Sequence, residues 1–303
     1  MRFALIARID QENQGKPRAD RVSIRAACAA LNVSPSGYYA WKGRPSSDRE
    51  RADRRLAERL EALHERYKRR YGLRRLDAML RREGRRHSIR RLRRLARAAG
   101  IECMHPKARA KTTVGGAARE GLVDLIDRAF VPEAPGQVLY SDITYIPTEA
   151  EGFVYLVLFA DACSRRIVGW EVADHMRTEM VTAALESAIT DLRPEIGQLI
   201  VHTDRGSQFT SNAFRDKCFA AGIIPSVGHT GSCFDNAQAE ALNATIKKEL
   251  IHPRRWTDLA EVRAALFEYI EIDYNRDRIH QGLGYLTPIE FEALSRIEFT
   301  EAA

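Results

Sequence analysis

Three acidic residues in the C-terminal part of the chain occupy positions where a carboxylate could do chemistry. Asp142 interrupts the β-rich run LYSDITYI, Asp204 follows the apolar run LIVHT, and Glu240 lies near the start of a helical stretch. A carboxylate inside a strand is costly unless it is paired or binds a metal ion. Each also has an ordinary interpretation: a strand-edge acid for Asp142, a turn former for Asp204, and a complement to the helix dipole for Glu240.

Together the three carboxylates predict a site for divalent cations. Mg²⁺ prefers oxygen ligands, and neighbouring carboxylates repel one another unless a cation lies between them. Two such ions about 3.5–4 Å apart can activate a nucleophile and stabilise the leaving oxygen in phosphoryl transfer. The carboxylates therefore favour a metal-dependent enzyme that acts on phosphate esters.

The elements around these residues predict an α/β domain after residue 135. Apolar runs predict strands at 138–146, 153–160, 166–172, 199–203 and 223–227. Helices are expected at 176–192, 212–221, 236–250, 257–272 and 287–296. Three consecutive strands followed by alternating helices and strands indicate a mixed sheet covered by helices. Asp204 then falls at a strand end, where sheet-based sites collect.

The N-terminal part predicts helices instead. Residues 20–42 resemble a helix-turn-helix, with Ser34 capping the second helix. Three charged helices follow: one at 48–70, a short one within 71–84 that Gly84 ends, and one from Ser88 to Gly100. The last of these is expected to turn one stripe inward, formed by Ile89, Leu92, Leu95 and Ala96. Residues 105–120 have the composition of a linker.

Charge is distributed unevenly along the 303 residues. Residues 1–111 hold 31 Lys and Arg against 12 Asp and Glu, a net +19, while the remainder holds 17 against 29, a net −12. The basic part predicts a polyanion-binding module, with nucleic acid favoured over a membrane surface. Five arginines on the last helix could form a solvated face, but with no acid among them we favour phosphate contact. They are Arg90, Arg91, Arg93, Arg94 and Arg97.

Two further observations restrict the setting. No apolar run reaches the roughly 18 residues of a membrane span, and the first 16 residues lack the features of a signal peptide. Five cysteines without a CxxC spacing argue against a disulfide framework and fit a reducing compartment. We expect a cytoplasmic protein without membrane contact.

Five strings stand in order along the C-terminal part of the chain: SDITYI, YLVLFADACSRRIVGW, HTDRGSQFTS, DNAQAEALNATIKKE and YIEIDYNRDRIHQGLGYLTP. Within them, Asp204 and Glu240 are separated by 35 residues. These strings resemble the catalytic core of insertion-sequence transposases that carry a DDE triad and are related to retroviral integrases. Within that group they resemble the OrfB product of the insertion-sequence-three family, in which the 35-residue spacing is familiar.

The resemblance implies a ribonuclease H-like fold, that is, a mixed five-stranded sheet with helices on both faces, preceded by an all-α basic DNA-binding region. We divide the chain accordingly. The expected parts are a helix-turn-helix-like segment (1–45), a basic helical region (46–105), a linker (106–134), the integrase-type core (135–250) and a C-terminal helical extension (251–303).

The resemblance also implies a function. Asp142, Asp204 and Glu240 would be the catalytic residues and the ligands of two Mg²⁺ (or Mn²⁺) ions. The chain would cleave transposon ends and transfer the 3′-hydroxyl to another DNA phosphodiester. Its partners would be double-stranded DNA of element ends and target, further copies of itself, and the upstream-frame (OrfA) product. The alternatives are an inactive DNA-binding regulator and a nuclease that hydrolyses without joining.

Other matched positions carry weaker expectations. The counterpart of Lys247 contacts DNA near the transposon end in the family, although a plain surface lysine remains possible. His202 and Arg205 flank Asp204 and would orient it or contact phosphate, and Asp161 is expected to be structural. A polar cluster is left open between core packing and DNA contact; it comprises Tyr274, Asn275, Arg278 and His280.

The sequence departs from the family pattern at three places. Tyr140 replaces a tryptophan, Ser226-Val227-Gly228 replaces Ser-Met-Ser, and Leu242 and Asn243 stand where aromatic residues often follow the glutamate. None of these removes an expected metal ligand, so they bear on DNA-end contacts and substrate preference. Asn236 is expected to set the entry to the helix of Glu240.

Overall fold

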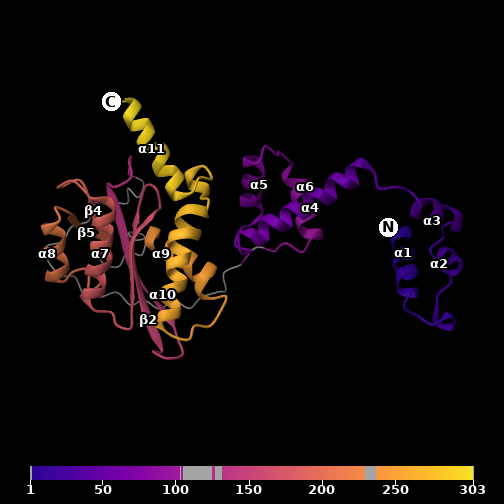
Figure 1. Cartoon of the computed structure of the whole chain (residues 1–303), viewed down its shortest axis with the longest axis horizontal. Helices are drawn as coiled ribbons and strands as arrows, with labels where there is room; N and C mark the ends of the chain where they lie inside the picture. Colours follow the sequence, from indigo (N-terminus) through magenta and orange to yellow (C-terminus); the bar gives the residue numbers. More distant parts are fainter. Residues whose placement is uncertain (1, 103, 105–124, 127–131, 229–236, 303) are drawn as a thin grey trace. The chain divides into compact units, whose positions relative to one another are not determined.

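The computed structural model describes residues 2–102, 104, 125–126, 132–228 and 237–302 (Figure 1). These residues divide into two compact units: Met1–Ala62 with Arg94–Gly100, and Leu63–Arg93 with Ile101–Ala303. Most of the expected linker, and Asn236, lie outside the described residues. No helix that the structure describes combines the length and apolar character needed to cross a membrane.

The smaller unit begins with three helices, α1 (Arg2–Asn13), α2 (Ile24–Ala30) and α3 (Pro35–Lys42). Ser34 caps α3 as expected, since its hydroxyl accepts a hydrogen bond from the amide of Gly37 at 3.0 Å. The sequence did not predict α1. Asp10 on α1 accepts hydrogen bonds from Tyr38 at 3.0 Å and Lys42 at 2.5 Å, and these contacts join α1 to α3.

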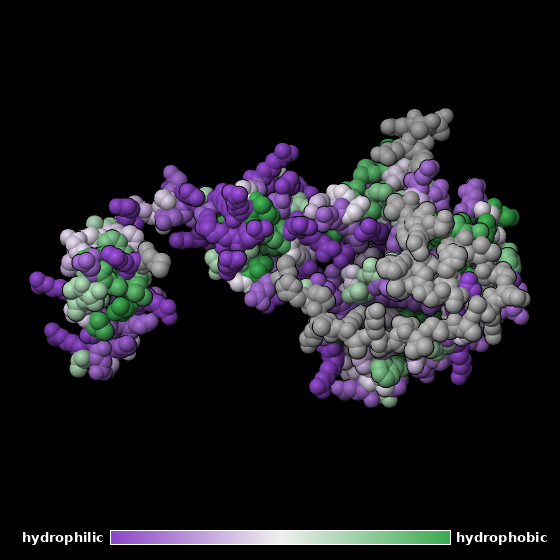
Figure 2. Space-filling view, turned by 180° about the vertical axis from the view of Figure 1, so that it is seen from behind, coloured by the Kyte–Doolittle hydropathy of each residue, from purple (hydrophilic) through white to green (hydrophobic). Residues whose placement is uncertain are grey.

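The expected basic helices are α4 (Asp48–Arg66), α5 (Leu73–Arg82) and α6 (Ile89–Ala98). Hydrophilic side chains gather over this region (Figure 2). Leu92, Leu95 and Ala96 are buried, but Ile89 is 40% exposed. Its predicted place on the inward stripe is therefore wrong. Ile89 is the first residue of α6, where no preceding helical turn covers the side chain.

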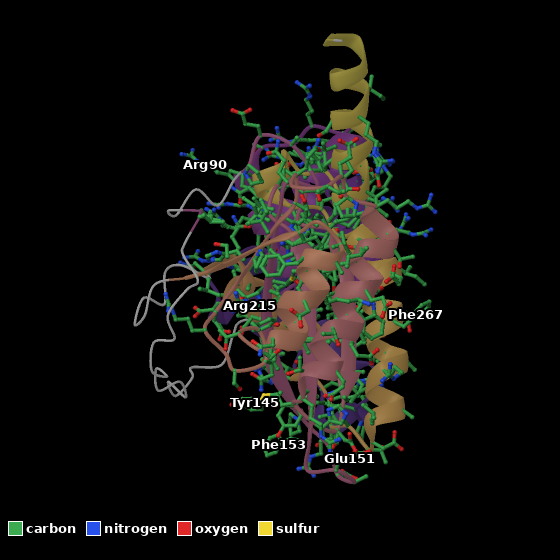
Figure 3. The ribbon with its side chains drawn as sticks, turned by 90° about the vertical axis from the view of Figure 1, so that its left-hand side faces the viewer. Arg90, Tyr145, Glu151, Phe153, Arg215 and Phe267 are labelled. Carbon is green, nitrogen blue, oxygen red and sulfur yellow. The ribbon has the colours of Figure 1, made fainter. Side chains whose placement is uncertain are left out.

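The larger unit contains the five predicted strands, β1 (Val138–Pro147), β2 (Phe153–Asp161), β3 (Ile167–Ala173), β4 (Ile200–Thr203) and β5 (Ile224–Val227). They form one sheet in the order β3-β2-β1-β4-β5. β1 to β3 pair antiparallel, whereas β4 is parallel to both β1 and β5. The mixed five-stranded sheet is confirmed. At one end of the β1–β2 hairpin, Tyr145 and Phe153 meet edge to face (Figure 3).

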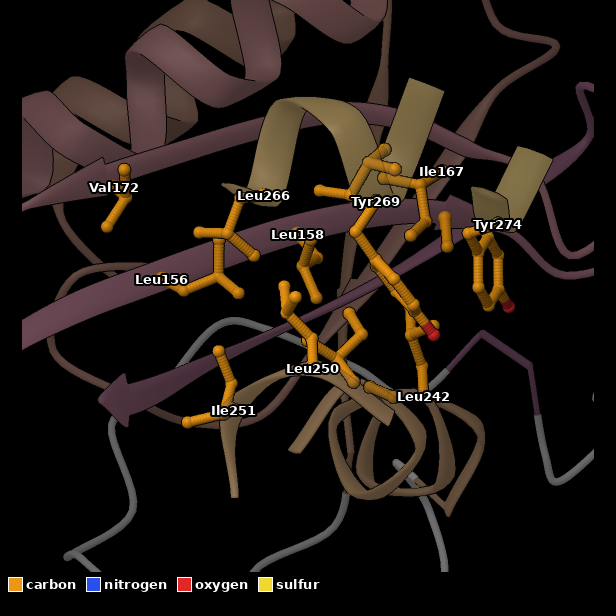
Figure 4. Packing of buried hydrophobic residues seen from close by; sticks show 14 of the residues in the cluster. Leu156, Leu158, Ile167, Val172, Leu242, Leu250, Ile251, Leu266, Tyr269 and Tyr274 are labelled. Carbon is orange, nitrogen blue, oxygen red and sulfur yellow. The ribbon is translucent and has the colours of Figure 1, made fainter. Parts of the chain in front are cut away.

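Helices cover both faces of the sheet, as expected (Figure 1). One face packs against α7 (Thr178–Leu192) and α8 (Asn212–Ala220) in one apolar cluster. The other packs against α9 (Ala237–Ile246) and α10 (Leu259–Phe267), each continued by a π-helical segment, Lys247–Ile251 and Glu268–Asp277. Figure 4 shows side chains of this second cluster, including Leu158, Leu242 and Tyr269. The last helix is α11 (Pro288–Ala302).

Helix α7 lies so close to β3 that a side chain cannot fit between them. A Cβ atom added to Gly169 would lie 2.3 Å from the carbonyl oxygen of Ala184 and 2.8 Å from the Cβ of Ala188. Both distances are shorter than a van der Waals contact. Gly169 is therefore required for this face of the sheet to close.

Within the larger unit, the segment around α5 docks on the acidic C-terminal part of the chain. Lys68 lies 2.7 Å from Glu268 and 2.8 Å from Asp273, and Arg82 lies 2.7 Å from Glu290. The Tyr71 hydroxyl donates to the carbonyl of Asp277 and accepts from the amide of Ile279. Part of the charge asymmetry of the sequence therefore serves an internal interface rather than a polyanion.

Candidate active site

Asp142 and Asp204 come from neighbouring parallel strands. Tyr140 on β1 pairs with His202 on β4. Asp142 and Asp204 each follow two residues after these paired residues. β1 continues past Asp142, whereas β4 ends at Thr203, so Asp204 begins the loop. Adjacent strands lie about 4.8 Å apart. The parallel register therefore places the two expected catalytic residues side by side at the carboxyl end of β4.

The carboxylate of Asp142 is strongly perturbed. Burial is the main cause, followed by the charge of Asp204 and, more weakly, that of Glu240, and together they raise its pKa to about 7. Hydrogen bonds to Oδ1 from the Ile143 amide at 2.9 Å and to Oδ2 from the Asn243 side chain at 2.8 Å oppose the shift. Asp204 is exposed, and its Oδ1 accepts from the amide of Gly206 at 2.9 Å. Negative charge is thus concentrated around Asp142.

Glu240 lies in the first turn of α9, the helix that packs against β1. Its charge acts on Asp142, but its side chain is exposed. Among the described residues, no three His, Cys, Asp or Glu side chains stand close enough together to hold one metal ion. The structure brings the three expected residues to one region without arranging them as a finished three-ligand centre.

The donor set nonetheless suits a hard divalent cation. Asp142 and Asp204 supply carboxylate oxygens, the ligands that Mg²⁺ prefers. Each hydrogen-bonded oxygen has one described donor, so it retains a lone pair. The pKa of Asp142 is raised mainly by burial and further by the charges of Asp204 and Glu240, and a bound cation would offset both effects.

His202 and Arg205 make contacts inside the protein. His202 is 2% exposed, and its Nδ1 lies 3.0 Å from the hydroxyl oxygen of Ser226 on β5. Arg205 is half-buried, and its Nε donates to the carbonyl oxygen of Gly228 at 2.8 Å. Both residues tie the β4 end to the β5 end, which supports Asp204. Their predicted DNA contacts remain predictions.

Lys247 begins the π-helical segment that continues α9. Its ammonium lies 4.5 Å from the ring centre of Tyr145, the aromatic residue at the end of the hairpin (Figure 3). Attraction between the cation and the ring fixes the lysine near the end of β1. Its predicted DNA contact also remains a prediction.

The five arginines of α6 have different surroundings. Arg90, Arg93, Arg94 and Arg97 are exposed, and Arg91 is half-buried. Arg94 forms an ion pair of 2.5 Å with Asp53, so one of the five charges is already partly neutralised. Among the residues described, Arg90, Arg93 and Arg97 form no ion pair. The phosphate-binding expectation therefore rests mainly on these three.

The polar cluster left open by the sequence is buried. Asn275 bonds to both backbone groups of Ile167 on β3, so it packs the core. Arg278 donates to both carboxylate oxygens of Glu249 and lies 3.1 Å from His280. Burial and the neighbouring Arg278 lower the pKa of His280 to about 2, which keeps the ring neutral.

Glu249 was not singled out by the sequence. Burial alone would raise its pKa, but the charge and hydrogen bonds of Arg278 outweigh that effect and lower it. Tyr269 donates a further hydrogen bond at 2.9 Å, and Arg75 of α5 lies 3.8 Å away. Glu249 is thus the buried anion at the centre of this network.

Asp161 has the structural role expected of it. Its carboxylate accepts hydrogen bonds from the amides of Gly136, Cys163 and Ser164 at 2.7, 3.0 and 2.6 Å. The side chain is completely buried and holds the turn between β2 and β3.

Asn243 lies beside Asp142, and the sequence analysis did not assign it a role in the site. It is 6% exposed and donates to Asp142 from one turn beyond Glu240. The available signal was its departure from the aromatic residue common at that position in the resembling family.

Comparison with protein families and known proteins agrees with this arrangement. Two models described as "Integrase core domain" match residues 132–233 and 221–288. A Mycobacterium tuberculosis protein assigned to insertion sequence element IS986/IS6110 is 38% identical, covering 87% of this chain and 96% of its own. The Escherichia coli "Transposase InsF for insertion sequence IS3A" is 33% identical over 89% and 94%. The Shigella sonnei "Transposase for insertion sequence element IS629" is 32% identical over 90% and 92%.

Two solved structures resemble the chain at lower identity. The HTLV-2 integrase catalytic core domain in complex with magnesium gives a TM-score of 0.40 at 20% identity, covering 53% of this chain and 98% of that one. A simian T-cell lymphotropic virus intasome in complex with PP2A regulatory subunit B56 gamma gives 0.43 at 17% identity, covering 71% and 70%.

Proposed function

The chain belongs to the insertion-sequence-three family of transposases, with an integrase core, and on that basis we propose that it cuts the ends of its element and joins them to new DNA. Each freed 3′-hydroxyl would attack a phosphodiester of the target DNA. The observation that carries this proposal is that Asp142 and Asp204 lie side by side at the carboxyl end of β4. The charge of Glu240 also acts on Asp142 there.

In this proposal Asp142 and Asp204 hold divalent metal, and Glu240 completes the ligand set. Two ions of Mg²⁺ (or Mn²⁺) in the active state would lower the pKa of the attacking hydroxyl and stabilise the negative charge on the leaving oxygen. A carboxyl group binds a cation only after it has lost its proton. Because the pKa of Asp142 is raised to about 7, metal binding there would displace a proton near neutral pH. Arg205 holds the loop that follows Asp204 through its hydrogen bond to Gly228.

DNA binding would involve two regions of the chain. Lys247 is seven residues beyond Glu240, and Arg90, Arg93 and Arg97 form the exposed basic face of α6. Phosphate contact by such residues supplies affinity without base specificity. We further propose that several copies act together on two element ends, that the upstream-frame (OrfA) product takes part, and that the protein works at a bacterial nucleoid.

A strand-transfer assay tests the proposal. The purified chain is incubated with Mg²⁺, a labelled duplex that carries the element's own ends, and target DNA. Asp204→Asn and Asp142→Asn should abolish cleavage and joining while DNA binding persists. Asp216→Asn is the matched control, because Asp216 is an exposed aspartate on α8, away from these residues.

The assay also separates the alternatives. Hydrolysis without a joined product would support a nuclease. DNA binding with neither reaction, even when Mn²⁺ replaces Mg²⁺ and the upstream-frame product is added, would support a regulator derived from a transposase. Full activity of Asp204→Asn would contradict the assignment of the site.

A further inference from the structure

Asn243 joins helix α9 to the strand that carries Asp142. Its side-chain Nδ2 donates to Asp142 Oδ2 at 2.8 Å, across 101 residues of sequence. The other oxygen of Asp142 is held by the amide of Ile143. Both carboxylate oxygens are therefore restrained, one by the backbone of β1 and one by a side chain from another element.

Asn243 and Glu240 belong to the same face of one helix. Residues three apart in a helix are neighbours on its surface, and α9 contains both within its ten residues. The neighbouring Leu242 packs in the apolar cluster beneath the sheet, which fixes the rotation of α9 (Figure 4). The packing that orients the Asn243 amide therefore also sets the position of Glu240 relative to Asp142.

We propose that Asn243 is a positioning residue that holds the Asp142 carboxylate in its metal-binding orientation. This inference rests on the proposed function, since it assumes that Asp142 is a metal ligand. Residues that hydrogen-bond to metal ligands fix ligand orientation, and their loss commonly weakens metal binding 10–100-fold. When Asp142 is ionised, as a metal ligand must be, its carboxylate only accepts hydrogen bonds, so the Asn243 NH₂ must face it.

The amide oxygen of Asn243 indicates that the residue is polar because of its bond to Asp142. Asn243 Oδ1 is buried and has no hydrogen-bond partner among the described residues. A buried acceptor without a partner is unfavourable, and an apolar residue of similar size would avoid that cost. The bond to Asp142 accounts for a polar residue here.

The test compares two substitutions with a control on the same helix. Asn243→Ala removes the amide, and Asn243→Leu removes it while keeping the branched arrangement of four heavy atoms. Thr245→Ala is the control, because among the described residues its hydroxyl bonds only to the carbonyl of Ala241. Mn²⁺ binding is measured by calorimetry on the full chain, and strand transfer is measured across a range of Mg²⁺ concentrations.

Both Asn243 variants should bind Mn²⁺ about 10–100-fold more weakly than the parent chain. The Mg²⁺ concentration for half-maximal strand transfer should rise by a similar factor, and excess metal should restore most of the rate. Thr245→Ala should match the parent in both measurements. A purely structural role would lower the folded fraction without shifting the metal dependence of the folded molecules.

Parent-like Mn²⁺ affinity in either folded Asn243 variant would overturn the inference. Asn243→Leu guards against failure to fold, since it fills the space left by the amide. Asp142→Asn and Asp204→Asn are measured in parallel. If they also bind Mn²⁺ like the parent, the proposed metal site itself is wrong; if they lose binding and the Asn243 variants do not, only the positioning role fails.

Discussion

Arg278 and Glu249 form a buried ion pair in which Arg278 Nη2 lies 2.9 Å from Glu249 Oε1. Arg278 is 8% exposed and Glu249 is 6% exposed. The pair connects the π-helical segment after α9 with the C-terminal segment that follows α10. Because Lys247 begins the same π-helical segment, this pair helps to fix the lysine expected to contact DNA.

Glu249→Leu should destabilise the larger unit by about 3–5 kcal/mol, because Arg278 would remain buried without its partner. The double variant Glu249→Leu/Arg278→Leu should recover much of that loss. Denaturant unfolding followed by tryptophan fluorescence measures both. Glu268→Gln, which removes the exposed pair with Lys68, should cost less than about 1 kcal/mol. Equal effects of Glu249→Leu and Glu268→Gln would contradict the central role of Glu249.

Asp142→Asn should stabilise the metal-free protein at alkaline pH. In the folded chain the pKa of Asp142 is about 7, against an ordinary value of 3.8. The folded state therefore keeps a proton that the unfolded chain has lost, and stability falls as pH rises from about 4 to 7. The variant lacks this fall, so it should gain roughly 1–3 kcal/mol at pH 8 and nothing near pH 4.

Unfolding in a chelating buffer at several pH values measures this effect. Asp216→Asn, on the exposed face of α8, should follow the parent at every pH. A gain for Asp142→Asn that is the same at pH 4 and pH 8 would show that the carboxylate charge is not its cause.

Removing Arg90, Arg93 and Arg97 together should weaken DNA binding regardless of sequence. Each phosphate contact contributes about 0.9 to the slope of log affinity against log salt, so the triple alanine variant should lower the slope by up to about 3. Affinity measured by fluorescence anisotropy at several salt concentrations gives this slope. Arg82→Gln is the control, because Arg82 is already paired with Glu290. An unchanged slope in the triple variant would assign the phosphate contacts elsewhere.

Lys247→Ala should also weaken DNA binding and lower the salt slope by about 1. Lys248→Ala, at the next position, supplies a control with the same charge change. If the two variants behave alike, the position of Lys247 over the Tyr145 ring has no special importance for DNA.

Gly169→Ala should destabilise the sheet, because the new methyl group would meet the backbone of α7 at 2.3 Å. Overpacking of this kind typically costs about 1–3 kcal/mol. Gly15→Ala, where the added group meets no atom within 4 Å, should leave stability nearly unchanged. Thermal unfolding compares the two, and equal melting temperatures would mean that α7 can shift away from β3.

The sequence predicted the strands to within one or two residues. Each apolar run is bounded by residues that favour turns, such as Gly222 before β5, which has a positive φ of 68°. That Asp142 and Asp204 share one site was implied by the resemblance to the transposase family, because the apolar pattern alone did not show that β1 and β4 are parallel neighbours. Local pattern was therefore sufficient for the strands but not for their order in the sheet.

Features that depend on distant partners were not predictable. The bond between Asn243 and Asp142 spans 101 residues, and that between Glu249 and Arg278 spans 29. A single sequence does not reveal such partners. The helix α1 was missed because Ile6 is one of only two buried residues on it, which leaves a weak apolar period.

The docking of the α5 segment changes where the chain can be cut. The expected domain boundaries separate an integrase-type core that starts at residue 135, but Leu63–Arg93 belongs to the same compact unit as that core. A fragment that starts at residue 135 would lose Tyr71, whose hydroxyl bonds to Asp277 and Ile279. Chimaeras that exchange DNA-binding regions between relatives should therefore keep residues 63–93 with their own C-terminal segment.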